Sequence, residues 1–315
     1  MNRNRSFASL ARKTLSLGTL GVAVVTAACA PESKGPQAAS PDRQAQAEYD
    51  LSRDAFYKGH LREALDHSQH ANTLDDTNAK ALYFTAVIYL AFCSTEGMKS
   101  PDCRLKDAER FARKAIDAQS DFRDARNMLG NVLILEEKYA DAMQVLEPLT
   151  RDPAYVANYL AWGNYGWAQV KAGKIDDGIA SLRNSITEPR FCVGDYHLGM
   201  AYEQKGNLEA AEKSFTDAVE VPSEDCQALQ DAWYERANVR VKLGSAAAAQ
   251  GDYARCREIG GKTETGKLCA QLAGGAAPTP VIPIKKAATP APPDAAPVEP
   301  PSRQASDAGH NTSTQ

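Results

Sequence analysis

The chain has 315 residues, with 36 lysines and arginines against 40 aspartates and glutamates, so its formal net charge is −4. No run of Lys and Arg forms the basic patch that nucleic-acid phosphates require, which argues against a nucleic-acid-binding protein. One apolar stretch near the start is too short for a membrane span, and no second apolar segment is long enough to cross a bilayer.

The first 28 residues have the composition of a secretory signal peptide. Their charges are all basic, and an apolar run too short for a membrane span follows. The basic residues are Arg3, Arg5, Arg12 and Lys13. Removal of residues 1–28, which hold four basic residues and no acidic one, lowers the net charge to −8.

Cys29 follows Thr26, Ala27 and Ala28, and small residues before a cysteine at this place resemble the lipobox of bacterial lipoproteins. The resemblance implies cleavage before Cys29 and lipidation of its thiol and its new amino group. Thr26 departs from the leucine that the lipobox favours, so ordinary signal cleavage near Cys29 is the alternative. Ala30, in place of an aspartate, implies sorting to the outer membrane, where the lipid would hold the chain at the periplasmic face.

Residues 29–44 form the next segment, a lipidated Cys29 followed by a disordered tether. They are rich in Pro, Ala, Ser and Gly and lack aliphatic anchors for a core. Such a tether would let the following domain stand away from the membrane surface.

A pair of short amphipathic helices separated by a turn is clearest at residues 192–219. Gly206 interrupts the helical pattern, and Gly199 and Ala211 are small enough to let two antiparallel helices approach closely. The periodic positions are Leu198, Gly199, Tyr202, Ala211, Phe215 and Ala218.

One hairpin cannot bury its own apolar face, so copies beside it are expected, and the chain supplies them. A small residue early in each second helix marks six units: Ala64, Ala108, Ala142, Gly178, Ala211 and Ala249. The markers are separated by 44, 34, 36, 33 and 38 residues, and the longest spacing reflects an insertion near residues 93–103.

This order of Leu-Gly, Tyr, Gly-Asn, Ala, Phe and Ala resembles the tetratricopeptide repeat, a helical hairpin of about 34 residues. The resemblance implies an all-α, right-handed superhelical solenoid of about six hairpins. The expected units are 45–78, 79–122, 123–158, 159–191, 192–229 and 230–260, followed by a capping segment at 261–272.

Six cysteines remain after Cys29, and they fall as neighbours along the chain. In an exported protein such cysteines favour disulfides between Cys93 and Cys103, Cys192 and Cys226, and Cys256 and Cys269. Other pairings stay open, because connectivity does not follow from sequence alone. A metal site is disfavoured, because no Cys-x-x-Cys pair occurs.

Other candidate chemistry is sparse. His67 and His70 lie three apart and could share a helix face as metal ligands do, but their polar neighbours indicate a solvated surface. The sequence contains no phosphate-binding loop, no G-x-S-x-G and no H-E-x-x-H motif. We therefore expect no enzyme activity, no cofactor, no metal and no small-molecule substrate. An enzyme that uses the cysteines or the two histidines is the alternative from another class.

In the repeat architecture the first helix of each hairpin lines a concave groove. Aromatic, Arg and Met side chains make good interface anchors, and Asn can bond to an extended peptide backbone. We expect a protein partner to contact this groove, although some of its residues could instead pack against a neighbouring hairpin. Phasing by the marker residues nominates Tyr49, Arg53, Phe56, Tyr83, Val87, Leu90, Asn127, Asn131, Ile134, Trp167, Tyr196, Met200, Tyr234 and Asn238.

Residues 273–315 consist mainly of Pro, Ala, Gly and small polar residues, so they cannot bury a core. We expect a disordered, extended Pro/Ala-rich tail, serving as a spacer or as a docking segment.

The signal peptide, lipobox cysteine, tether and six repeats together resemble the type IV pilus biogenesis and stability lipoproteins, the pilotins, including those of social gliding motility. The resemblance implies a non-enzymatic outer-membrane scaffold that binds a secretin subunit and promotes its assembly. The alternative is a repeat lipoprotein that serves as an adaptor in β-barrel assembly or in peptidoglycan-enzyme regulation, although such proteins commonly have fewer repeats.

Overall fold

A computed structural model describes residues 40–187 and 189–274 of the chain. The predicted signal peptide, the predicted lipidation site at Cys29 and the predicted tail from residue 275 onward lie outside the described residues. Within the described ranges the protein is entirely helical, with no strand. None of the helices there is long and apolar enough to cross a membrane.

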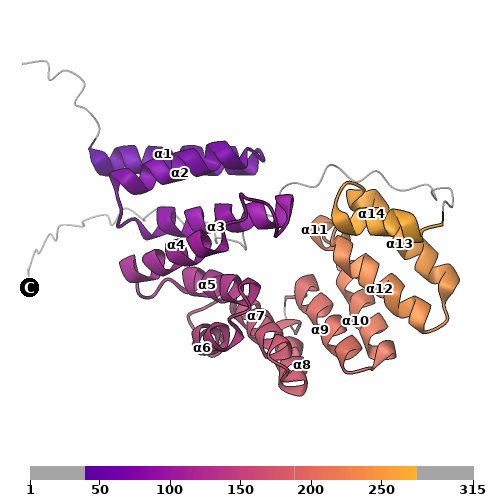
Figure 1. Cartoon of the computed structure of the whole chain (residues 1–315). Coiled ribbons are helices and arrows are strands. Elements are labelled where there is room, and N and C mark those ends of the chain that lie inside the picture. Colours follow the sequence, from indigo (N-terminus) through magenta and orange to yellow (C-terminus); the bar gives the residue numbers. More distant parts are fainter. Residues whose placement is uncertain (1–39, 188, 275–315) are drawn as a thin grey trace, which may run out of the picture. The chain divides into compact units, whose positions relative to one another are not determined.

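Six antiparallel hairpins follow one another along the chain, each packed on the next (Figure 1). They pair α1 with α2, α3 with α4, α5 with α6, α7 with α8, α9 with α10, and α12 with α13. The helices are α1 (Pro41–Tyr57), α2 (Leu61–Leu74), α3 (Ala79–Glu96), α4 (Leu105–Ala118), α5 (Arg123–Leu135), α6 (Tyr139–Thr150), α7 (Asn158–Lys171), α8 (Ile175–Ser185), α9 (Cys192–Gln204), α10 (Leu208–Glu220), α11 (Glu224–Gln227), α12 (Gln230–Lys242), α13 (Ala246–Gly260) and α14 (Glu264–Leu272). The prediction of an all-α solenoid of hairpins is confirmed.

The first helix begins earlier than expected. The sequence predicted a tether as far as residue 44, but α1 starts at Pro41. Proline suits the first turn of a helix, where its missing N–H has no intrahelical acceptor to bond. The short α11 was not expected, and α14 lies within the predicted capping segment.

The two helices of a hairpin approach most closely at a pair of small residues twelve positions apart. The pairs are Ser52 with Ala64, Gly130 with Ala142, Gly166 with Gly178, Gly199 with Ala211, and Ala237 with Ala249. A Cβ atom added to Gly199 would lie 2.5 Å from the Phe215 ring, and one added to Gly130 would lie 2.4 Å from Leu146. A larger residue at these positions would push the helices apart.

The second hairpin departs from this spacing because it carries an insertion. Its small residues Ala86 and Ala108 are ten positions further apart than in the other hairpins. The structure joins Cys93 to Cys103, ten residues apart, so the disulfide closes a loop of the same length as the insertion. The hairpin geometry on either side is thereby preserved.

The other two disulfides lie in the last two hairpins. One joins Cys192, at the start of α9, to Cys226 in α11, and the other joins Cys256 in α13 to Cys269 in α14. All three bonds connect the neighbouring cysteines that the sequence favoured. The second and third attach the short helices α11 and α14, which have few residues with which to bury a core of their own.

Four of the turns between paired helices contain a glycine in the left-handed region: Gly59, Gly173, Gly206 and Gly244, with φ from 80° to 84°. In the third hairpin Glu137 occupies the same place with φ 61°. The N–H of Gly173 donates to the Val170 carbonyl, and the N–H of Glu137 donates in the same way to Ile134. Glu137 therefore adopts a conformation that costs an L-residue about 1 to 2 kcal/mol.

Replacement of Glu137 by glycine is expected to stabilise the protein. The gain should be about 0.5 to 1 kcal/mol, because relief of the left-handed strain exceeds the extra entropy of the unfolded chain. Chemical denaturation of Glu137→Gly and wild type would measure the difference. The matched control is Gly173→Glu, where a Cβ meets no atom within 4 Å, so only backbone strain should destabilise it. A loss of stability in Glu137→Gly would contradict the strain argument.

Candidate functional site

The first helices of the six hairpins, α1, α3, α5, α7, α9 and α12, carry all of the residues predicted to line a groove. Their side chains divide into two groups by burial. Those that are partly or fully exposed, and so can contact a partner, are Tyr49, Arg53, Leu90, Asn131, Trp167, Tyr196, Met200, Tyr234 and Asn238. We call these nine residues the first-helix face.

Five of the predicted groove residues are buried instead: Phe56, Tyr83, Val87, Asn127 and Ile134. Phe56 is 1% exposed and packs edge-on against Phe84 of the next hairpin, with ring centroids 5.3 Å apart. Tyr83 similarly packs against Phe122, at 5.1 Å. Their assignment to an open groove was wrong, because the neighbouring hairpin covers these positions.

In the first hairpin, a cation lies between two aromatic rings. The Arg53 guanidinium carbon is 5.7 Å from the Tyr49 ring centroid and 6.0 Å from that of Tyr57. A hydrogen bond with Tyr57 is the main cause that raises the pKa of Arg53 above its ordinary value. Tyr57 is 52% exposed and was not predicted as a site residue. Its position one residue after Phe56 places it on the open side of the helix.

The middle of the first-helix face combines amides with one stacked aromatic pair. The Asn164 side chain donates to Asn127 Oδ1 at 3.1 Å, which ties α7 to α5 beside Asn131. Sequence reasoning missed Asn164, although its spacing from Trp167 is helical. Trp167 stacks on His197 of α9, with ring centroids 4.4 Å apart and planes inclined by 1°.

Burial keeps His197 neutral. Desolvation lowers the pKa of His197 to about 3, from its ordinary value of 6.5. Its Nδ1 atom is buried and has no hydrogen-bond partner among the described residues. The imidazole therefore acts as a flat, uncharged support that holds the orientation of Trp167.

The last two hairpins place carboxylates around the face. Burial, followed by the charges of Asp231, Glu235 and Glu203, raises the pKa of Tyr196. Asn238 is held in place, because its amide donates to Glu235 Oε2 at 3.0 Å and its Oδ1 accepts from the Tyr253 hydroxyl at 2.8 Å. The face thus runs from a cation at Arg53 to an acidic group at its other end.

The histidine pair of the sequence analysis serves a local role. His67 Nδ1 lies 2.6 Å from Glu48 Oε2, and His70 Nδ1 lies 3.1 Å from Glu48 Oε1. The pair therefore shares one carboxylate that connects α2 to α1. No group of three or more potential metal ligands occurs among residues 40–187 and 189–274.

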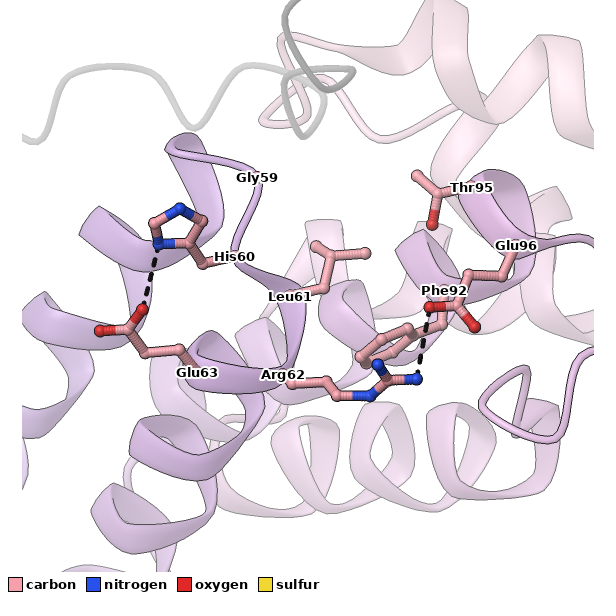
Figure 2. Close-up of a pocket in the computed structure, with 8 residues that line it drawn as sticks. All are labelled: Gly59, His60, Leu61, Arg62, Glu63, Phe92, Thr95 and Glu96. Atoms are coloured by element: carbon pink, nitrogen blue, oxygen red, sulfur yellow. Dashed lines mark hydrogen bonds and ion pairs between the residues drawn. The ribbon is translucent and has the colours of Figure 1, made fainter. Parts of the chain in front are cut away.

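The turn side of the first two hairpins holds a separate open pocket of about 420 Å³ (Figure 2). Its wall comes from the α1–α2 turn, the start of α2 and the end of α3. Its polar side chains have partners: His60 Nδ1 lies 3.1 Å from Glu63, and Arg62 contacts Glu96 of the wall at 3.7 Å and Asp102 outside it. None of the predicted groove residues lines it.

The fold defines a helical-repeat protein built of stacked hairpins. The tetratricopeptide repeat family matches residues 196–225. No curated protein matches the sequence.

Solved structures share the fold at low sequence identity. The crystal structure of PilW, a widely conserved type IV pilus biogenesis factor, has a TM-score of 0.54 and 22% identity, covering 72% of this chain and 98% of PilW. The pilF protein of Pseudomonas aeruginosa has a TM-score of 0.52 and 14% identity, covering 74% of this chain and 99% of pilF. A monomeric mutant of IFIT1 with m7Gppp-AAAA has a TM-score of 0.58 and 12% identity, covering 74% of this chain and 53% of IFIT1. These similarities show the fold.

His197 takes up a proton at a higher pH in the unfolded chain than in the folded protein. The free energy of unfolding should therefore fall as the pH decreases below about 6.5. The contribution of His197 to the free energy of unfolding should drop by about 1.4 kcal/mol between about pH 7.5 and pH 5.5. Replacement by phenylalanine keeps an aromatic ring beside Trp167 and removes the titration.

Urea denaturation of wild type and His197→Phe at both pH values measures this change. On going to the lower pH, wild type should lose about 1.4 kcal/mol more of its free energy of unfolding than His197→Phe does. Parallel pH dependence in both proteins would show that His197 is not held neutral.

Proposed function

We propose that the chain is a non-enzymatic outer-membrane lipoprotein that binds a type IV pilus secretin subunit and promotes its assembly. The observation that carries the proposal is the first-helix face, which extends over all six hairpins and joins aromatic, amide and charged side chains. The fold similarity to PilW and pilF, which covers 98% and 99% of those two chains, supports the choice of pilus biogenesis.

The first-helix face suits an extended protein segment. Trp167, Tyr196 and Met200 supply apolar area with little loss of side-chain freedom on binding. The Asn131 amide can both donate to and accept from a peptide backbone. None of these groups forms a catalytic arrangement with an activated nucleophile or a general base, whereas all of them suit binding.

The charges along the face give the bound segment a direction. Arg53, at the first hairpin, would pair with an acidic group of the partner. Asp231 and Glu235, near Tyr196, would favour a basic group, whereas Glu203 is already paired with Lys242. We therefore orient the secretin segment with its acidic end at α1 and its basic end at α12.

The lipid on Cys29 supplies the second part of the mechanism. Anchoring at the membrane raises the local concentration of the scaffold where secretin subunits arrive. A scaffold that binds the unassembled subunit in its folded form also stabilises that subunit by mass action. Both effects favour assembly without any chemical step.

The fold similarity to IFIT1 does not favour RNA as the ligand. The net charge of this chain is −4, and the carboxylates of Asp231 and Glu235 lie near Tyr196 of the first-helix face. Such a surface repels phosphates.

The proposal is tested by the assembly state of the pilus secretin in membranes from a deletion strain. Heat-resistant multimers should disappear on deletion and return with the wild type. They should fail to return with Cys29→Ala, which removes the anchor, and should decrease with Trp167→Ala, which removes an anchor of the face. The matched control is Trp162→Ala on the same helix, whose ring packs on Tyr165 instead.

Unchanged multimers in the deletion strain would overturn the proposal. Defects in outer-membrane β-barrel proteins or in peptidoglycan synthesis in that strain would then support the adaptor function. If Trp167→Ala and Trp162→Ala reduced the amount of secretin multimers equally, the substitutions would act by disturbing the fold of the scaffold and not by weakening secretin binding.

A further inference from the structure

A pocket of about 310 Å³ lies on the other side of the hairpins from the first-helix face. It is formed by α4, α5 and α6, with α5 contributing Arg126 and Leu129. At roughly 100° per residue, these two side chains point about 150° away from Asn127 and Asn131 on the same helix. The pocket is therefore separate from the proposed secretin-binding surface.

The pocket has an apolar interior of a size that suits a single branched side chain. Its apolar lining consists of Ile116, Leu129, Val145 and Pro148. Leu129 is 3% exposed and belongs to the core, whereas Ile116 and Val145 are partly exposed. The volume lies at the small end of the range for ligand pockets in proteins.

Pro148 gives the wall a free hydrogen-bond acceptor. It lies inside α6 and has no N–H, so the carbonyl of Gln144, four residues earlier, lacks its helical donor. Gln144, Val145 and Pro148 all line the pocket. Gln144 is exposed, so water can bond to this carbonyl in the free protein, and a ligand N–H can take the place of that water.

Arg126 gives the wall a charge that no ion pair neutralises. Its Nη2 donates to the Ser120 carbonyl at 2.5 Å, but no carboxylate of the described residues lies within 4.0 Å of it, and its Nε has no hydrogen-bond partner there. The nearby Asp152 is bonded to Arg123 at 2.7 Å. Of the other two charged side chains of the pocket, Arg113 is paired with Glu109 at 2.7 Å, and Asp117 lies exposed on α4.

We propose that this pocket binds the C-terminal residue of a partner protein, with a branched apolar side chain in the cavity. Such a residue offers three groups in one unit: a carboxylate for Arg126, an N–H for the Gln144 carbonyl and a side chain for the apolar interior. An internal segment of a partner supplies the N–H and the side chain but no main-chain carboxylate. The unpaired guanidinium is what selects a chain terminus.

The test uses two small probes and the purified full chain. N-acetyl-L-leucine carries the three groups, whereas N-acetyl-L-leucinamide lacks only the charge. Saturation-transfer NMR should detect binding of the acid in the millimolar range, and the amide should bind about tenfold more weakly. Equal binding of the two probes, or binding of neither, would overturn the proposal without any variant being needed.

Two variants locate the binding. Arg126→Gln should remove the preference for the acid, and Val145→Trp should abolish binding of both probes by filling the cavity. The matched control is Arg110→Gln on α4, which pairs with Asp107 outside the pocket and should bind the acid as the wild type does. Unaltered binding by Val145→Trp in a protein of normal melting temperature would place the probe elsewhere and contradict the assignment.

Discussion

The structure depends on the close approach of two helices at a pair of small residues in each hairpin. Where Gly199 meets Phe215 or Gly130 meets Leu146, the second helix lies against the first with no room for an additional Cβ. Within a hairpin there is room for a large side chain only where it lies over a glycine, as Phe215 and Leu146 do, so other large side chains point toward the next hairpin. Stacking of hairpins follows, because each of them leaves apolar surface that only a neighbour can cover.

That stacking separates the two surfaces of functional interest. Side chains between adjacent hairpins, such as Phe56 and Tyr83, become core, and other positions of the first helices, such as Arg53 and Tyr57, stay open. On the second-helix side, a pocket lies between α4, α5 and α6, with the proline of α6 in its wall. One repeat architecture therefore supports an extended interaction face and a small, localised site.

The sequence predicts the hairpins well, because small residues and glycine turns have to recur wherever two helices pack closely. Gly199, Ala211 and Gly206 already indicate one complete unit. The site is less predictable, since periodicity gives the face of a helix but not how far the neighbouring hairpin covers it. This is why Asn127 and Ile134 prove buried, and why Asn164 and the pocket around Arg126, which depend on contacts between hairpins, were missed. Tyr57 was missed although it lies exposed beside Arg53 on the same helix.

The central claim is that the secretin contacts the first-helix face. Site-specific photo-crosslinking in cells tests it most directly, with benzoylphenylalanine in place of Asn131 on that face and, as the comparison, in place of the exposed Glu220 at the end of α10. The account predicts a crosslinked secretin adduct from position 131 and none from position 220. A secretin adduct from position 220 alone, or none from either position in a strain that assembles pili, would contradict it.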